Sequence, residues 1–352
     1  MSFHIDELLG YAIDSDASDL HISVGSIPMI RINGTMHPLN LPPIAREQMD
    51  VVVKEVMNED QQARFRAHKE IDFSRRLGER GRFRVNFFKQ INGISGVFRV
   101  IPSQAKNFEE LGLPPVLAKL SMRDRGLILL TGPTGSGKST TLASMVDYMN
   151  EHRRAHIITI EDPVEYFHSS KNCLINQREL GQSTDSFANA LRSALREDPD
   201  IILVGEMRDL ETVQLALTAA ETGHLVLSTL HTSSASKTID RVIDIFPTGQ
   251  KGQIRTMLSE SLEAVIAQKL LPSKDGKGRI PALEIMIASS AIRNLIREDK
   301  IYQIPSVVQS GGTDGMQTLD QDLMRLVSQG AIDRSKAAQV ADNPKQFEQG
   351  IL

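Results

Sequence analysis

The sequence is poor in the features that would place a protein outside the cytoplasm. It has one cysteine, Cys173, in 352 residues, so it can form no intrachain disulfide, which suits a reducing compartment. It has no apolar run of about 18 residues, and no basic stretch at the N-terminus leads into an apolar segment. We therefore predict a cytoplasmic protein with neither a transmembrane segment nor a signal peptide.

The charge balance and the absence of tryptophan limit the expected partners. The formal net charge is −4, and the sequence has no tryptophan. This balance argues against a protein that mainly neutralises nucleic-acid phosphates, although a local basic groove would be compatible with it. We expect no nucleic-acid partner.

The length predicts two domains, because a chain of 352 residues exceeds the size at which one hydrophobic core usually stops growing. Residues 1–101 are expected to form a mixed α/β domain. The pattern predicts one long helix over 46–67 and hairpin turns at Asn33-Gly34 and Asn92-Gly93.

The composition changes after residue 101. Residues 102–117, rich in proline and glycine, are predicted to be a linker to a second domain over 118–352. That domain has apolar runs separated by helical segments, and the runs lie at 126–131, 156–160, 201–204 and 225–229. Buried parallel strands are apolar throughout, so this alternation predicts an α/β fold with a mostly parallel sheet. A helical region is expected from about 288 to 352.

The segment after the first apolar run matches the phosphate-binding motif G-x-x-x-x-G-K-[ST]. It follows a predicted strand and leads into a predicted helix, the context that the motif requires. Its backbone N–H groups can wrap an anion at the helix N-terminus, Lys138 can reach the β- and γ-phosphates, and the Ser139 hydroxyl can bind Mg²⁺. We predict a site for ATP and Mg²⁺. The residues expected to bind ATP are Gly132, Thr134, Gly135, Ser136, Gly137, Lys138, Ser139 and Thr140.

Hydrolysis of ATP also needs an acidic group that holds the metal or positions water. Glu161, Asp162 and Glu165 follow the second apolar run, and Glu206 follows the third. Many ATPases with this motif end the third strand in Asp then Glu, whereas here Gly205 occupies the Asp position. Glu206, expected to bind the metal with Ser139, would therefore act alone or with help from the first cluster.

Two histidines, His224 and His231, bracket the predicted strand 225–229. A histidine beside a strand is more often structural than catalytic, so the residues alone leave both interpretations open. Two histidines seven residues apart supply no zinc ligand set.

The second hairpin of the first domain predicts a cationic face. A two-residue turn at Asn92-Gly93 would pair Val85 with Val100 and Phe87 with Phe98. On that register Arg82, Arg84 and Arg99 share the face opposite the phenylalanines, as a candidate partner for phosphate or carboxylate. An ordinary solvated sheet face is an equally good interpretation of the three arginines.

Over nearly its whole length the sequence resembles the type IV pilus retraction ATPases of the secretion ATPase superfamily. The resemblance lies in the phosphate-binding motif and in several blocks on either side of it. These blocks are Ser18-Asp19-Leu20-His21, 159–165, 195–200, 205–209, 222–232 and Ala291-Ile292-Arg293-Asn294-Leu295-Ile296-Arg297-Glu298. The last block resembles the motif associated with retraction rather than pilus assembly.

The resemblance implies a PAS-like N-terminal domain, a RecA-like ATPase domain and a homohexameric ring. It also implies that Glu206 is an atypical Walker B acid and that His224 and His231 lie near the nucleotide. Arginines from the region of Arg82, Arg84 and Arg99 would reach the γ-phosphate. The expected partners are an inner-membrane platform protein and a paralogous retraction ATPase, with the ring at the inner membrane at the pilus base.

Three alternatives share parts of this pattern. A pilus assembly or secretion ATPase would use the same chemistry, but the block 291–298 and the short N-terminal region favour retraction. A nucleic-acid motor would show turnover stimulated by nucleic acid. A non-hydrolysing scaffold would lack the acids, and all four are present.

Overall fold

The computed structural model describes residues 4–32, 34–78, 80–102, 105–276 and 278–348. The chain divides into two compact units. The first comprises Met1–Gln104 with Glu165–Phe167, and the second comprises Ala105–Val164 with His168–Leu352. In the part of the chain that the structure describes, no helix is both long enough and apolar enough to cross a bilayer.

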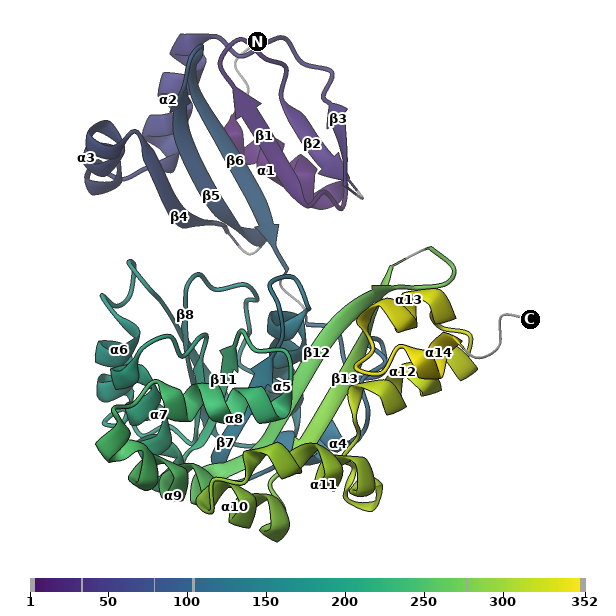
Figure 1. Cartoon of the computed structure of the whole chain (residues 1–352). Helices are drawn as coiled ribbons and strands as arrows, with labels where there is room; N and C mark the ends of the chain where they lie inside the picture. Colours follow the sequence, from purple (N-terminus) through teal and green to yellow (C-terminus); the bar gives the residue numbers. More distant parts are fainter. Residues whose placement is uncertain (1–3, 33, 79, 103–104, 277, 349–352) are drawn as a thin grey trace. The chain divides into compact units, whose positions relative to one another are not determined.

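The first unit is a six-stranded sheet with helices (Figure 1). The strand order is β3-β2-β1-β6-β5-β4, and neighbouring strands are antiparallel. Its elements are α1 (Ile5–Asp14), β1 (Asp19–Ser23), β2 (Met29–Ile32), β3 (Thr35–Pro38), α2 (Arg46–Val56), α3 (Glu59–His68), β4 (Glu70–Leu77), β5 (Gly81–Gln90) and β6 (Gly93–Ile101).

The helix predicted over 46–67 is two helices, and this prediction was wrong. Met57 is extended between α2 and α3, with φ −109° and ψ 136°. Asn58 then caps α3, because its side chain accepts a hydrogen bond from the Gln61 N–H at 2.8 Å while the Gln61 side chain accepts from the Asn58 N–H at 3.0 Å. The reciprocal cap starts a new helix where hydrophobic spacing alone suggested continuation.

The β5–β6 hairpin also differs from its predicted register. Gln90 pairs with Gly93, so the turn residues are Ile91 and Asn92, and Phe87 lies opposite Gly96 rather than Phe98. Gly96 leaves room for this ring, because a Cβ there would lie 2.8 Å from the Phe87 side chain. Moving the turn by one position shifts the pairing by two residues, so each side chain stays on its predicted face. The other predicted turn, at Asn33-Gly34, includes Asn33, which lies outside the described residues, but Ile32 and Thr35 pair across it.

The second unit contains a seven-stranded sheet in the order β13-β12-β7-β11-β10-β8-β9, in which all pairs except β12–β13 are parallel. Its strands are β7 (Gly126–Thr131), β8 (His156–Glu161), β9 (Leu174–Glu179), β10 (Ile201–Val204), β11 (Leu225–Leu230), β12 (Leu262–Pro272) and β13 (Arg279–Ile287). The four apolar runs predicted as strands correspond to β7, β8, β10 and β11.

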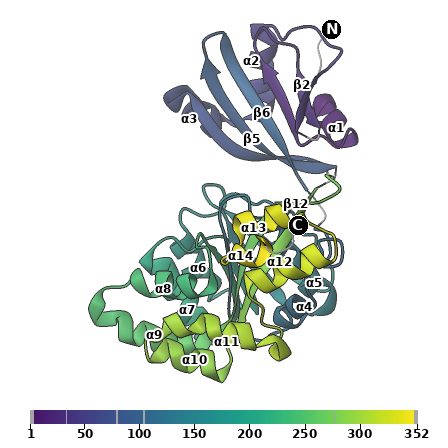
Figure 2. The same cartoon turned by 45° about the vertical axis from the view of Figure 1, so that its right-hand side comes forward.

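Helices cover both faces of this sheet (Figures 1 and 2). They are α4 (Val116–Ser121), α5 (Lys138–His152), α6 (Phe187–Ala194), α7 (Leu210–Glu221), α8 (Ala235–Asp244), α9 (Lys251–Ser261), α10 (Ser290–Arg297), α11 (Ile304–Ser310), α12 (Leu319–Ser328), α13 (Arg334–Val340) and α14 (Lys345–Glu348). Among the described residues, short 3₁₀ turns lie at Thr248–Gln250, Ile301–Gln303 and Gly312–Asp314.

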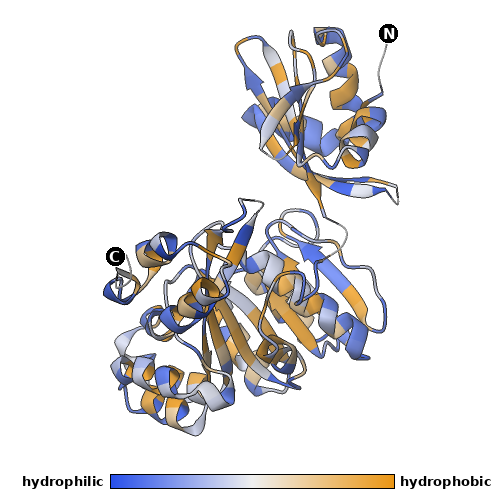
Figure 3. Cartoon of the chain, turned by 90° about the vertical axis from the view of Figure 1, so that its right-hand side faces the viewer, coloured by the Kyte–Doolittle hydropathy of each residue, from blue (hydrophilic) through white to orange (hydrophobic). Residues whose placement is uncertain are grey.

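The core of the second unit follows the alternation of side chains along its strands. In β7, Leu127 and Leu129 pack in one cluster with α6 to α10, while Ile128 and Leu130 pack on the other face with α4 and α5. Figure 3 shows these strands as a hydrophobic interior under helices with hydrophilic outer sides. A smaller cluster joins α12 and α13 to β12 and β13. The packing fixes the sheet, and therefore the edge where its parallel strands end.

Candidate nucleotide site at the carboxyl edge of the second sheet

The segment predicted to bind phosphate joins the end of β7 to the start of α5. Gly137 is the N-cap of α5 with φ 88°, so the first helical residue is Lys138. Lys138 is 8% exposed, and its Nζ donates to the backbone oxygens of Gly132 at 2.8 Å and Pro133 at 3.2 Å. These two bonds hold the Lys138 ammonium group against the backbone of the loop.

The loop has the features expected of an anion cradle. Ser139 and Thr140 lie half-buried in the first turn of α5, whereas Thr134 and Gly135 are exposed. The Ser136 hydroxyl is buried and has no hydrogen-bond partner among the described residues. A buried lysine, an unsatisfied hydroxyl and a helix N-terminus all favour an anionic ligand here, so the loop fits the phosphates of ATP.

Gln268 of β12 contacts this loop, and sequence reasoning missed it. Its side-chain nitrogen donates to the Ser136 backbone oxygen at 2.8 Å, and its side-chain oxygen accepts from the Thr141 hydroxyl at 2.8 Å. A glutamine within the apolar strand sequence Leu262–Leu271 was the available signal, since buried polar side chains need partners.

We expect Gly132→Ala to destabilise the second unit much more than Gly135→Ala. Both glycines have positive φ, 144° and 78°, but a Cβ at Gly132 would overlap the Gln268 backbone oxygen whereas a Cβ at Gly135 meets nothing within 4 Å. The free energy of unfolding should fall by about 3 kcal/mol or more for Gly132→Ala and by about 1 kcal/mol for Gly135→Ala. Calorimetric unfolding of the two variants measures these losses. Equal losses would contradict the steric overlap between a Cβ at Gly132 and the Gln268 backbone oxygen.

Two of the predicted polar side chains meet at the same edge of the sheet. Glu206 follows β10 and His231 follows β11, and the His231 Nε2 lies 3.4 Å from a Glu206 carboxylate oxygen. Since β7, β10 and β11 are parallel neighbours in the order β7-β11-β10, all three end where the phosphate loop begins. The fold therefore brings the loop, the acid and one histidine to one edge.

Glu206 has a second partner, Arg208, which sequence reasoning also missed. An Arg208 nitrogen lies 2.7 Å from the other Glu206 carboxylate oxygen. Burial raises the pKa of Glu206, but the hydrogen bond and charge of Arg208, with His231, outweigh it and hold the pKa below its ordinary range. Glu206 is therefore ionised at neutral pH. Gly205 fits its position because a Cβ there would lie 3.2 Å from the Ile160 backbone oxygen.

The other three predicted acids do not form one cluster with Glu206. Glu161 ends β8 at the same edge, where its carboxylate accepts from Thr159 at 2.6 Å and from Gln177 at 3.3 Å. Asp162 is exposed and contributes to the electrostatic environment of Arg208. Glu165 is exposed and belongs to the first unit, so this acidic block is divided between the two units.

His224 lies at the opposite edge of the sheet from the phosphate loop. It precedes β11, and its Nδ1 lies 3.0 Å from the Ala219 backbone oxygen. The six residues of β11 span about 20 Å. The structure therefore does not bring His224 to the loop of its own chain, and a role for it at the nucleotide stays a prediction.

The three arginines of the first unit lie on one face of the β5–β6 hairpin, with Arg84 directly opposite Arg99. Arg99 donates to a carboxylate oxygen of Asp19 at 2.8 Å, and Arg84 lies 4.0 Å from Asp72. Burial opposes ionisation of Asp19, but hydrogen bonds from Ser18 and Arg99 together with the Arg99 charge lower its pKa overall. Arg82, the third, is half-buried opposite Ile101.

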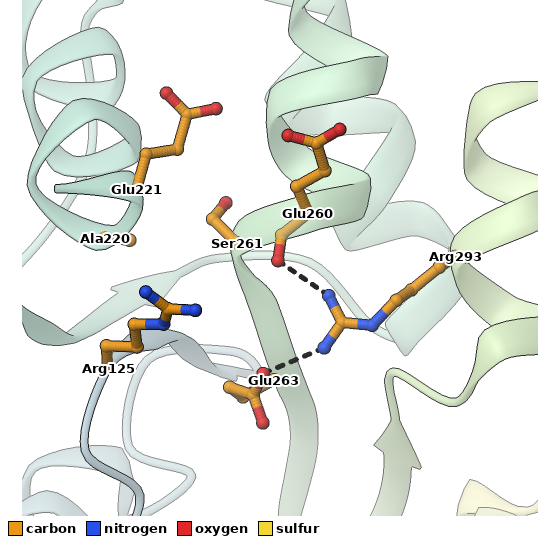
Figure 4. A pocket seen from close by; sticks show the side chains of 8 residues that line it. Arg125, Ala220, Glu221, Glu260, Ser261, Glu263 and Arg293 are labelled. Atoms are coloured by element: carbon orange, nitrogen blue, oxygen red, sulfur yellow. Dashed lines mark hydrogen bonds and ion pairs between the residues drawn. The ribbon is translucent and has the colours of Figure 1, made fainter. Parts of the chain in front are cut away.

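A cavity of about 550 Å³ lies at the amino edge of the sheet, away from the phosphate loop (Figure 4). Arg293 of α10 reaches its wall and donates to the backbone oxygens of Ser259 and Glu260 and to the Glu263 carboxylate, each at 2.8 Å. These contacts join α10 to the end of α9 and the start of β12. Arg293 in the block 291–298 therefore has a structural role in this unit.

We expect Arg293→Met to lower the free energy of unfolding by about 2 kcal/mol, because two carbonyls lose a charged donor while Glu263 keeps its other partner, Arg123. Arg297→Met is the matched control, since Arg297 is on the exposed face of the same helix. Calorimetric unfolding should show almost no loss for the control. The same small loss in both variants would mean that the Arg293 contacts contribute little.

Comparisons with known proteins identify the family of the chain. Residues 2–282 match the family model described as Type II/IV secretion system protein. The chain is 56% identical over 343 residues to the type IV pilus retractation ATPase PilT of Pseudomonas aeruginosa, covering 97% of this chain and 99% of that protein. It is 57% identical over 316 residues to the twitching motility protein of Neisseria gonorrhoeae, covering 90% of this chain and 84% of the relative.

A solved structure, the pilus retraction motor PilT with bound ADP, matches with a TM-score of 0.91 and 47% identity, and the match covers 99% of each chain. Together with the family match, this likeness confirms the predicted fold class, an α/β chain with a RecA-like ATPase domain and a smaller N-terminal domain.

Proposed function

This chain belongs to the type II/IV secretion system protein family, in which it is a pilus retraction ATPase, and on that premise we propose how its residues use ATP to do the work. The observation that carries the proposal is the shared carboxyl edge of the second sheet. There the cradle that contains Lys138 lies at the end of one parallel strand and the ionised Glu206 follows another.

In the proposed site the phosphates of ATP occupy the loop 132–139. Lys138 would exchange its bonds to the Gly132 and Pro133 oxygens for bonds to the β- and γ-phosphates. The first-turn hydroxyl of Ser139 and the carboxylate of Glu206 would hold Mg²⁺, which supplies positive charge against the phosphates when bound. Among the described residues no three His, Cys, Asp or Glu side chains form a metal cage, which suits an ion held with its nucleotide.

Hydrolysis in this proposal depends on an acid that orients the attacking water. Glu206 is the first candidate, because Arg208 and His231 fix both of its carboxylate oxygens and keep it ionised. Glu161 is the second candidate, because it ends the neighbouring strand β8, where its carboxylate accepts hydrogen bonds from Thr159 and Gln177.

We further propose that the chain works as a cytoplasmic homohexamer at the inner membrane at the pilus base. Arginines of the first unit, from Arg82, Arg84 and Arg99, would close over a γ-phosphate and release it after hydrolysis, so that the two units rotate relative to each other. That rotation would act through an inner-membrane platform protein to remove pilin, with a paralogous ATPase as a second component of the machine.

Arg99→Gln should leave ATP affinity within about threefold of the original but slow hydrolysis by about 1,000-fold, the lower end of the range for such arginines. The substitution also removes a positively charged partner of the Asp19 carboxylate. Arg31→Gln is the control for that effect. The Arg31 Nε lies 4.0 Å from the same carboxylate, and Arg31 is not among the proposed arginines. Turnover and nucleotide binding are measured on the assembled protein. Unchanged turnover in Arg99→Gln would remove its proposed role.

The biological direction is tested by deleting the gene in its host and complementing with the intact chain or with Lys138→Ala. We expect abundant surface pili without twitching motility in the deletion strain, corrected by the intact chain only. Loss of pili in the deletion strain would instead identify an assembly motor.

A further inference from the structure

Gln268 connects three parts of the second unit. It lies on β12 next to Ala267, which pairs with Thr131 at the end of β7, and it is 2% exposed. Its side-chain oxygen accepts from Thr141 of α5, and its side-chain nitrogen donates to the backbone oxygen of Ser136 in the loop. One buried amide therefore joins the sheet, the phosphate loop and the first turn of the helix.

The bond to Ser136 fixes the orientation of a loop peptide. A trans peptide bond is planar, with its C=O and N–H pointing in opposite directions. Because the Ser136 oxygen points at Gln268, the N–H of Gly137 must point away from β12. Backbone N–H groups that face away from the protein wall are the donors that bind phosphate in a loop of this kind.

The loop is packed closely against Gln268. A Cβ on Gly137 would lie 2.8 Å from the Gln268 side-chain nitrogen, and a Cβ on Gly132 would overlap the Gln268 backbone oxygen. The two glycines that the motif fixes, Gly132 and Gly137, therefore allow close contact with Gln268. A methionine would fill the same space but could not donate to Ser136, and an ionised glutamate would place a negative charge against the Ser136 oxygen.

We propose that Gln268 is a positioning residue that holds the phosphate loop in its binding conformation before the nucleotide arrives. The inference rests on the proposed use of the loop to bind ATP. Holding the Ser136–Gly137 peptide in advance lowers the ordering cost of binding both ADP and ATP. Such a residue affects affinity for the nucleotide rather than the chemical step, because it favours the ground state and the transition state equally.

Gln268→Met should therefore weaken ADP binding about tenfold and raise KM for ATP about tenfold, with kcat within about threefold. Gln268→Glu should weaken ADP binding more than Gln268→Met does. Thr141→Val is a milder variant that removes only the tether of the Gln268 oxygen, and it should weaken ADP binding about threefold. In the Gln268→Met background, Thr141→Val should add no further loss of affinity.

The matched control is Gln317→Met. The Gln317 side chain is half-buried in the same unit and donates to the Leu283 backbone oxygen at 2.9 Å, so its replacement removes the same kind of bond away from the loop. ADP affinity is measured by calorimetry on the full chain. A second readout needs no nucleotide: amide hydrogen exchange of segment 132–141 should be faster in Gln268→Met than in Gln317→Met.

The outcomes separate this inference from the proposed site. If Lys138→Ala binds ADP normally, the proposed site itself is wrong. If Lys138→Ala loses ADP but Gln268→Met binds ADP like the original chain, the site stands and Gln268 has no positioning role. A loss of kcat with unchanged ADP affinity in Gln268→Met would also overturn the inference.

Discussion

Lys138→Ala is expected to lower ATP turnover by at least about 100-fold, with loss of nucleotide binding. Lys138 would contact two phosphates, and each hydrogen bond to a charged group contributes about 1.5–3 kcal/mol, so their sum corresponds to about 10²- to 10⁴-fold. Lys138 is 8% exposed, and its Nζ donates to the backbone oxygens of Gly132 and Pro133, so the ammonium group already lies against the loop that would hold the phosphates. Turnover and ADP affinity are measured on the full chain.

Lys251→Ala is the control for this prediction. Lys251 is in α9, where its ammonium group contacts Asp244, so its loss removes a lysine without touching the loop. We expect the control to keep full turnover. Normal turnover in Lys138→Ala would mean that the phosphates bind elsewhere and would remove the basis of the proposed site.

Glu206→Gln should slow hydrolysis by about 100- to 1,000-fold, because the amide keeps the shape of the side chain but loses the charge that orients water. Because Glu206 contributes to the chemical step more than to the phosphate cradle, ADP affinity should change by less than about threefold. Single-turnover hydrolysis separates the two effects.

The pH dependence of turnover tests the partners of Glu206. Its pKa in the folded protein is below the ordinary range, so the active, ionised form persists at neutral pH and is lost only as the pH falls through that lowered value. Arg208→Ala removes the hydrogen bond and charge that lower the pKa of Glu206, so the acid limb of the turnover profile should move to higher pH.

Glu161→Gln discriminates between the two candidate acids. A larger loss of turnover in Glu161→Gln than in Glu206→Gln would transfer the water-orienting role to Glu161.

Much of the second unit could be predicted from its sequence, because buried parallel strands leave a strong local signal. β7, β8, β10 and β11 are mostly apolar, and helical segments separate them. The phosphate loop was equally visible, because its glycines, lysine and serine have fixed spacing between a strand and a helix.

Features that depend on contacts between distant segments could not be predicted in the same way. Gln268 is 132 residues from Ser136, and only the pairing of β12 with β7 brings them together. The turn at Ile91 and Asn92 depends on the fit of Gly96 against Phe87, about which hydrophobic spacing contains no information. The break between α2 and α3, in contrast, has a local signal, because Asn58 and Gln61 have the three-residue spacing of a reciprocal helix cap.

The position of His224 could have been predicted more fully. A strand carries the residues before it and after it to opposite edges of a parallel sheet, so His224 and His231 could not both lie beside the same phosphate loop. The resemblance suggested both residues, whereas the direction of β11 places only His231 near Glu206.

The most direct test of the account is to follow single labelled pili in living cells of the deletion strain that carry either the intact chain or Lys138→Ala. We predict that extended pili retract in cells with the intact chain, and that pili extend but stay extended in cells with Lys138→Ala. Retraction at the original frequency in Lys138→Ala cells would contradict the claim that nucleotide bound at this loop powers retraction.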